Sequence, residues 1–231
     1  MIISGLQKLT LLDYPGRVAA TVFLGGCNFR CPFCHNATLV KSPSECEAIE
    51  DKKLLSFLET RRGILDGVCI TGGEPLLRDD IGSLISDIKS LGFAVKIDTN
   101  GSRPEMLDKL LSTGVVDMVA MDIKAAPDNY TLATATKIDI DAIDRSIRLI
   151  MEKAPDYEFR TTYVKPLHSE WDVIEIAKWI SGARAYYIQN FKDSGDLING
   201  NGFSPFSDEE LTGFLELARK YAPNSHIRGD S

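Results

Sequence analysis

Three cysteines, Cys27, Cys31 and Cys34, lie close together in the segment GGCNFRCPFCHN, with the spacing C-x3-C-x2-C. Glycines before the first cysteine and Pro32 between the second and third favour a loop over a helix. Three neighbouring thiols cannot all be paired with one another, and the total of five cysteines is odd. The pattern therefore indicates reduced or metal-bound cysteines and not a disulfide framework.

The number of thiols restricts the kind of metal site. A structural zinc ion takes four ligands, so zinc would need one more from His35, Cys46, Cys69 or a distant histidine. A [4Fe-4S] cluster held by three cysteines keeps one iron without a protein ligand, and a substrate can bind there. The dense thiols and the aromatic Phe33 favour the cluster, with zinc as the alternative.

A second motif, TGGEPLLR, begins at residue 71. Gly72 and Gly73 allow a ligand to approach bare backbone, and Glu74 can accept hydrogen bonds from an amine. Alone, the motif is equally typical of a strand-to-helix turn with Pro75 at the first helical position. Next to a three-cysteine loop the motif becomes a more specific signal. An open iron needs a chelating ligand, and an amino acid offers both an amine and a carboxylate.

The elements that must position these motifs alternate along the chain. Apolar runs rich in β-branched residues predict six buried strands, at residues 18–24, 67–71, 94–98, 117–123, 157–164 and 185–191. Amphipathic helical patterns lie between them, several closed by glycine. Six parallel β/α units with right-handed crossovers fall short of the eight that close a barrel, so we expect an α/β fold of the partial (β/α)6 barrel type.

The chain ends and the overall size complete this picture. At 231 residues we expect a single domain over 1–231, with residues 1–17 as a lead-in. Residues 203–231 are expected to form a C-terminal helix and tail, because Ser207 and Glu210 make a capping box.

Polar residues recur where the predicted strands end. The motif DTNG (98–101) ends the third strand, DIK (122–124) ends the fourth, Arg160 lies within the fifth, and Gln189 and Asn190 lie late in the sixth. In a β/α barrel these strand ends share one rim, where active sites lie. The placement predicts a single site that also includes the cysteine loop and TGGEP.

Composition excludes some partners. A formal net charge of −7 disfavours a surface that tracks nucleic-acid phosphates, so we expect no DNA or RNA partner. The start of the chain lacks a signal-peptide pattern, and no apolar run is long enough to span a membrane. We expect a cytoplasmic protein without a membrane partner.

The cysteine loop and the GGEP segment resemble the radical S-adenosylmethionine (SAM) superfamily, and the resemblance spans nearly the whole chain. It implies that Cys27, Cys31 and Cys34 hold a [4Fe-4S] cluster whose open iron is chelated by the amino and carboxylate groups of SAM. The stretch LLDYPGRVAATVFLGGCNFRCPFCHN resembles the activating enzymes of glycyl radical enzymes. Among them it looks most similar to the type that serves anaerobic ribonucleoside-triphosphate reductase, with pyruvate formate-lyase activases as near relatives.

The resemblance also implies roles for individual residues. Gly72, Gly73 and Glu74 would line the methionyl group of SAM, Phe33 would lie against the adenine, and Arg160 would lie near the ribose. A histidine that some relatives carry after the sixth strand has no clear counterpart, since this chain has NFK there.

A possible monovalent cation beside SAM is a further implication. Asp98, Thr99 and Asp122 match positions that hold such an ion in pyruvate formate-lyase activase, and Lys124 completes the Asp-x-Lys motif at the catalytic site. Without the resemblance, solvated salt bridges at a barrel rim are the less favoured alternative for the charged residues among these.

The function implied is reductive cleavage of SAM followed by abstraction of a hydrogen atom from a glycine of a partner glycyl radical enzyme. The favoured partner is anaerobic ribonucleotide reductase, with a pyruvate formate-lyase type enzyme second, and flavodoxin or ferredoxin is expected as the electron donor. One alternative is a small-molecule radical SAM enzyme such as 7-carboxy-7-deazaguanine synthase. The other is a non-catalytic iron-sulfur or zinc protein that uses the same cysteines.

Overall fold

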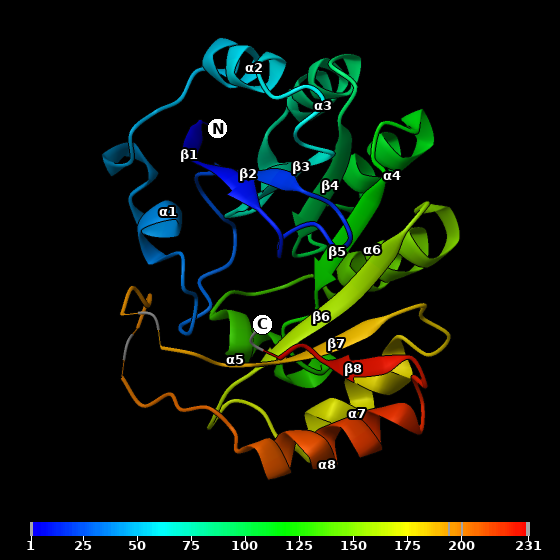
Figure 1. The fold of residues 1–231 in the computed structure, drawn as a ribbon. Coiled ribbons are helices and arrows are strands. Elements are labelled where there is room, and N and C mark those ends of the chain that lie inside the picture. The colour runs from blue at the N-terminus through cyan, green and yellow to red at the C-terminus, as the bar shows by residue number, and fades with distance from the viewer. Residues whose placement is uncertain (1, 194, 200, 230–231) are drawn as a thin grey trace.

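The strands of the computed structural model form one sheet, and the structure describes residues 2–193, 195–199 and 201–229. The sheet has eight strands in the order of the sequence. Figure 1 shows how they lie side by side. Strands β2 to β8 run parallel, and β1 pairs antiparallel with β2. The strands are β1 (Ile3–Thr10), β2 (Ala19–Leu24), β3 (Gly67–Gly72), β4 (Ala94–Thr99), β5 (Met118–Asp122), β6 (Tyr157–Tyr163), β7 (Tyr186–Asn190) and β8 (Ser225–Ile227).

Helices connect the parallel strands and cover the outer side of the curved sheet (Figure 1). They are α1 (Ala37–Lys41), α2 (Asp51–Glu59), α3 (Ile81–Ser90), α4 (Pro104–Thr113), α5 (Tyr130–Thr134), α6 (Ile140–Lys153), α7 (Glu170–Trp179) and α8 (Asp208–Arg219). Helix α8 begins at the predicted capping box, in which the Ser207 and Glu210 side chains each bind the other's backbone N–H. Short 3-10 turns follow at Pro43–Glu45, Pro75–Leu77 and Pro127–Asn129.

The central strands are apolar because both faces of the sheet are covered. Side chains such as Val68, Ile70, Val95, Ile97 and Val119 are completely buried. Burial on both faces is typical of parallel strands between a barrel interior and a helical layer. Polar residues at the strand ends surround the site, and a few others, such as Lys96 and Glu158, are buried within strands.

The predicted α/β partial barrel is confirmed, and its six predicted strands are β2 to β7. Two further strands were missed. Strand β1 lies within the expected lead-in 1–17, and its half-exposed edge sequence ISGLQKLT lacks a clear alternation. Strand β8 has only three residues and follows α8 in the expected C-terminal helix and tail. The assignment of 1–231 to a single domain stays a prediction.

Among the described residues, no helix combines the length and the apolar character that crossing a membrane requires.

Candidate active site

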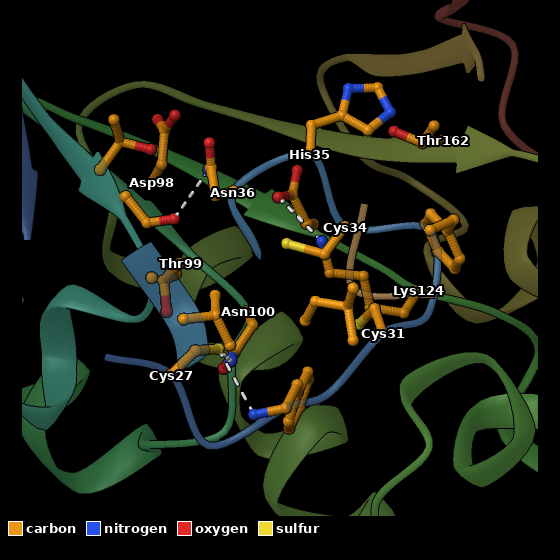
Figure 2. A pocket seen from close by; sticks show the side chains of 18 residues that line it. Cys27, Cys31, Cys34, His35, Asn36, Asp98, Thr99, Asn100, Lys124 and Thr162 are labelled. Atoms are coloured by element: carbon orange, nitrogen blue, oxygen red, sulfur yellow. Dashed lines mark hydrogen bonds and ion pairs between the residues drawn. The ribbon is translucent and has the colours of Figure 1, made fainter. Parts of the chain in front are cut away.

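The three-cysteine segment is a loop that leaves β2, as predicted. A tight turn closes it, in which the Cys34 N–H donates to the Cys31 carbonyl at 3.0 Å. All three thiols are free; Cys31 is buried, and Cys27 and Cys34 are partly exposed. Figure 2 shows the three side chains on this loop, with Asp98, Thr99 and Asn100 of the β4 end and Lys124 beside them.

The loop and the strand ends enclose a cavity of about 230 Å³. All the predicted site residues except Glu74 and Arg160 line it: Cys27, Cys31, Phe33, Cys34, Gly72, Gly73, Asp98, Thr99, Asp122 and Lys124. The structure therefore brings the motifs after four strands to one place. Which of these residues bind a ligand stays a prediction.

Burial favours the protonated form of two of the thiols, Cys27 and Cys31. It raises the pKa of Cys27, and it raises the pKa of Cys31 to about 12 despite the nearby charge of Lys124. Burial also lowers the pKa of Lys124, but the charge of Asp122 and its hydrogen bond raise it more, so the ammonium is retained. Iron binding would have to displace the thiol protons, which a permanent positive charge beside the loop favours.

The donor set fits the iron-sulfur cluster proposed for it, because three free thiols from one loop face one cavity beside a lysine ammonium. The Cys27 sulfur also accepts hydrogen bonds from the Phe29 N–H at 3.4 Å and the Asn100 amide at 3.8 Å. Hydrogen bonds of this kind stabilise sulfur that carries negative charge. Among the residues that the structure describes, no group of three or more His, Cys, Asp or Glu side chains is arranged to hold a single metal ion.

Gly72 and Gly73 allow close backbone contact between the two motifs, and the approach of a ligand to them stays a prediction. A Cβ on Gly73 would lie 1.8 Å from the Gly26 carbonyl oxygen, and Gly72 has a φ of +113° and would clash with Leu24. The Gly73 N–H donates to the Leu24 carbonyl at 2.8 Å, and the Glu74 N–H donates to the Gly26 carbonyl at 2.9 Å. The second motif is thus fastened to the base of the cysteine loop.

Glu74 lies behind the cavity wall. Its side chain is fully buried and accepts hydrogen bonds from the Thr99 hydroxyl at 2.8 Å, the Asn100 N–H at 2.6 Å and the Leu76 N–H at 3.1 Å. Burial raises its pKa to about 7, and these three donors limit the rise. Glu74 therefore ties the turn after β3 to the end of β4, and through Asn100 it reaches the sulfur of Cys27.

Arg160 also lies outside the cavity wall, between two carboxylates. Its guanidinium donates to Asp122 at 2.8 Å and pairs with Asp98 at 3.2 Å, and it lies 3.8 Å from Glu158. Lys124 contacts the other oxygen of Asp122 at 3.1 Å. Burial raises the pKa of Asp122, but the charges of Arg160 and Lys124 lower it by a larger amount. The net result is a pKa well below the ordinary range.

Sequence reasoning missed two residues that position this site. The Asn36 amide donates to the Gly72 carbonyl at 3.0 Å, which joins the two motifs a third time. His168 accepts from the Val164 N–H at 3.1 Å and therefore donates through Nε2 to the Lys124 carbonyl at 2.8 Å. Its ring meets Phe33 edge to face, with centroids 6.0 Å apart. Of the two, only Asn36 lies in the segment GGCNFRCPFCHN from which the site was predicted.

A second cavity, of about 860 Å³, adjoins the first and shares His35 and Thr162 with it. Gln189 and Asn190 of β7, which were expected at the rim, line this second space. Its edge includes Leu11 and Leu12, which are 66% and 67% exposed. A larger space with an apolar edge therefore lies next to the site, with His35 and Thr162 between the two cavities.

The family model described as the radical SAM superfamily matches residues 21–180. The chain belongs to the radical SAM superfamily. Membership implies a [4Fe-4S] cluster and SAM, and it identifies the protein as an enzyme, so a non-catalytic zinc or iron-sulfur protein is set aside.

Relatives narrow the position within the radical SAM superfamily. A Methanocaldococcus jannaschii protein, provisionally named a glycyl-radical enzyme activating enzyme, is 32% identical over 98% of this chain and 95% of its own length. The pyruvate formate-lyase-activating enzyme of Listeria monocytogenes is 30% identical over 62% of this chain and 60% of that protein. The 7-carboxy-7-deazaguanine synthase of Halobacterium salinarum is 28% identical over 94% of this chain and 86% of that protein.

Solved structures agree on the fold. Streptococcus suis SuiB bound to its precursor peptide SuiA superposes with a TM-score of 0.67 at 17% identity. The match covers 90% of this radical SAM chain and 48% of SuiB, so this chain corresponds to about half of that protein.

Proposed function

We propose that this radical SAM enzyme is an activase that cleaves SAM reductively and abstracts a hydrogen atom from a glycine of a partner glycyl radical enzyme. The relatives named as activating enzymes support it, foremost the one that matches almost the full length of both chains. We favour anaerobic ribonucleotide reductase as the partner, on the resemblance of the N-terminal segment, and place a pyruvate formate-lyase type enzyme second. Flavodoxin or ferredoxin is the proposed electron donor.

In this proposal the cavity residues hold and orient both groups. Cys27, Cys31 and Cys34 would ligate the cluster, which when reduced supplies the electron for SAM cleavage. Lys124 offsets the negative charge of the ligand thiolates, because it lies close enough to Cys31 and Cys34 for their charges to shift its own pKa. The Asn100 amide fixes the orientation of the Cys27 sulfur.

The SAM-binding part of the proposal uses the rest of the cavity. Gly72, Gly73 and Thr99 would border the methionyl group, and Asp98 and Asp122, each held in ion pairs with lysine or arginine, would line the cavity beside it. Phe33, held by the His168 ring, would present a flat apolar surface to the adenine. Glu74 and Arg160 would position residues that line the cavity. Glu74 orders Thr99 and Asn100. Arg160 links Asp98 to Asp122.

The single observation that carries the partner class is the second cavity. It is several times larger than the first, shares the lining residues His35 and Thr162 with it, and is bordered by the exposed Leu11 and Leu12. A loop of another protein can enter such a space and cover its apolar edge. Holding the target glycine against the site is then a matter of geometry, because no acid or base is needed for hydrogen transfer.

A small-molecule enzyme is the second candidate, favoured by the deazaguanine synthase relative that covers 94% of this chain. The test is 5′-deoxyadenosine formation by reduced enzyme with SAM, measured with candidate glycyl radical proteins and, separately, with pterins. The activase reading predicts slow cleavage alone and stoichiometric cleavage with the right protein. Rapid multiple turnover with a pterin, and none with any glycyl radical protein, would establish the small-molecule enzyme instead.

A cytoplasmic location is proposed as well. All five cysteines are free, which suits a reducing compartment.

A further inference from the structure

All four carboxylate oxygens of Asp98 and Asp122 face nitrogen cations. The Lys96 ammonium contacts Oδ1 of Asp98, and the Arg160 guanidinium lies 3.2 Å from Oδ2. On Asp122, Arg160 donates to Oδ1 at 2.8 Å and Lys124 donates to Oδ2 at 3.1 Å. The two acids that the resemblance assigns to a monovalent metal ion are thus already neutralised by three side chains.

The third expected ligand is engaged too. The Thr99 hydroxyl donates to Glu74 at 2.8 Å and accepts from the Gly101 N–H at 3.1 Å. A metal ion between these groups would displace existing hydrogen bonds and lie next to Lys96 and Arg160, whose like charges repel it. The residues present therefore do not fit a monovalent metal ion.

Lys96 is the unusual member of this group. It lies in the middle of β4, one alternation before Asp98, so both side chains point to the same face of the strand. It is only 1% exposed, and besides Asp98 its ammonium contacts the sulfur of Cys69 at 3.7 Å, the residue in register with it on β3. A lysine so deeply buried is stable only when its charge is paired, which fixes the ammonium at the carboxylate.

We propose that the Lys96 ammonium is a built-in counterion for the Asp98–Asp122 pair, so that SAM binding by this enzyme requires no monovalent metal ion. The inference rests on the proposed function in one respect, because SAM is taken as the ligand of the cavity. Lysine carries a compact charge with three donors, and here it takes the place of a small cation. Asp98 lines the cavity, so the charge that SAM meets there is set by Lys96 and Arg160.

The competing view is that Lys96 and Asp98 form an ion pair that serves folding alone. Both views predict that Lys96→Met destabilises the protein, because a buried carboxylate oxygen loses its partner. Only the counterion proposal predicts that a potassium ion can enter the vacated space and restore SAM binding.

The test compares SAM affinity of the reconstituted enzyme in potassium chloride and in tetramethylammonium chloride at equal ionic strength. Tetramethylammonium keeps ionic screening constant. It is too large to replace the lysine ammonium, and it binds carboxylate oxygens too weakly. The unmodified enzyme should bind SAM equally in both salts. Lys96→Met should lose at least about tenfold in tetramethylammonium, equivalent to about 1.4 kcal/mol, and recover most of it in potassium.

Lys89→Met is the matched control. Lys89 donates to Asp117 at 2.8 Å at the opposite end of the strands, so the variant loses the same charge and a partly exposed ion pair far from the cavity. Its SAM affinity should not depend on the salt. Melting temperature without SAM is a second measurement. Potassium should raise the melting temperature of Lys96→Met, and it should not change that of Lys89→Met or of the unmodified protein.

Three results would overturn the proposal. In the first, the SAM affinity of the unmodified enzyme falls about tenfold when tetramethylammonium replaces potassium. This comparison tests the proposal even if Lys96→Met does not fold. In the second, a folded Lys96→Met variant loses the same SAM affinity in both salts, which would leave Lys96 a role in folding only. The third is equal melting temperatures of Lys96→Met in both salts. An unmodified enzyme that binds no SAM in either salt would instead refute the proposed function, and the melting comparison would still test the ion.

Discussion

Gly73→Ala should separate the two motifs of the site. The new Cβ would lie 1.8 Å from the Gly26 carbonyl oxygen, so one backbone must move by more than 1 Å to reach an ordinary contact. That movement breaks the hydrogen bonds from Gly73 to Leu24 and from Glu74 to Gly26. Two hydrogen bonds at about 1 kcal/mol each give about 2 kcal/mol of lost stability.

For a protein of this length, that loss corresponds to a fall in melting temperature of about 4–8 °C. The larger effect is expected on the cluster, because Gly26 precedes Cys27 and its displacement moves the first ligand away from the Asn100 amide. The assays are thermal melting and iron content after anaerobic reconstitution.

Gly82→Ala is the control for this substitution. Gly82 lies in α3, where an added Cβ would make an ordinary contact 3.5 Å from Leu110, and alanine favours the helix by about 0.5–1 kcal/mol. It should keep its iron and melt at the same or a slightly higher temperature. If Gly73→Ala behaves like Gly82→Ala in both assays, the two motifs are not held together as described.

The cysteines, the cluster and His168 give three further predictions. Alanine at any proposed ligand should abolish iron binding, whereas alanine at the two remaining thiols should leave it intact: the first set is Cys27, Cys31 and Cys34, and the second is Cys46 and Cys69. Reconstituted protein should hold about four irons per chain, and near-stoichiometric zinc after reconstitution would contradict the cluster. Burial lowers the pKa of His168 below its ordinary 6.5, so the unfolded chain takes up a proton first and stability should fall as the pH drops below about 6.5. A plot of melting temperature against pH should be flatter in this range for His168→Gln, but not for the exposed His226→Gln. Equal plots for the two variants would show that His168 does not cause the pH dependence.

The sequence predicts what depends on local pattern. Strands β2 to β7 were predictable because parallel strands buried on both faces are nearly continuous apolar runs. The gathering of Asp98, Asp122 and the cysteines followed from barrel topology, because the carboxyl ends of parallel strands share one rim. Strand β8 could not be predicted, because three residues carry no periodicity.

What escaped prediction depends on partners distant in sequence. Glu74 was expected to face a ligand, yet its three donors come from its own turn and from Thr99 and Asn100 on the next strand. His168 gains its role from the Lys124 carbonyl, which lies 44 residues earlier. Lys96 did carry a signal, because a lysine inside the apolar run AVKID must find a counter-charge, but only the structure identifies Asp98 as that partner.

The central claim is the transfer of a hydrogen atom from a glycine of another protein, and electron paramagnetic resonance tests it most directly. Reduced enzyme, SAM and purified anaerobic ribonucleotide reductase should give a doublet from the single α-hydrogen of a glycyl radical. One 5′-deoxyadenosine should form per radical, and alanine at the target glycine should remove the signal. The absence of a doublet with this reductase and with pyruvate formate-lyase type enzymes, from protein that holds its cluster and binds SAM, would contradict the account.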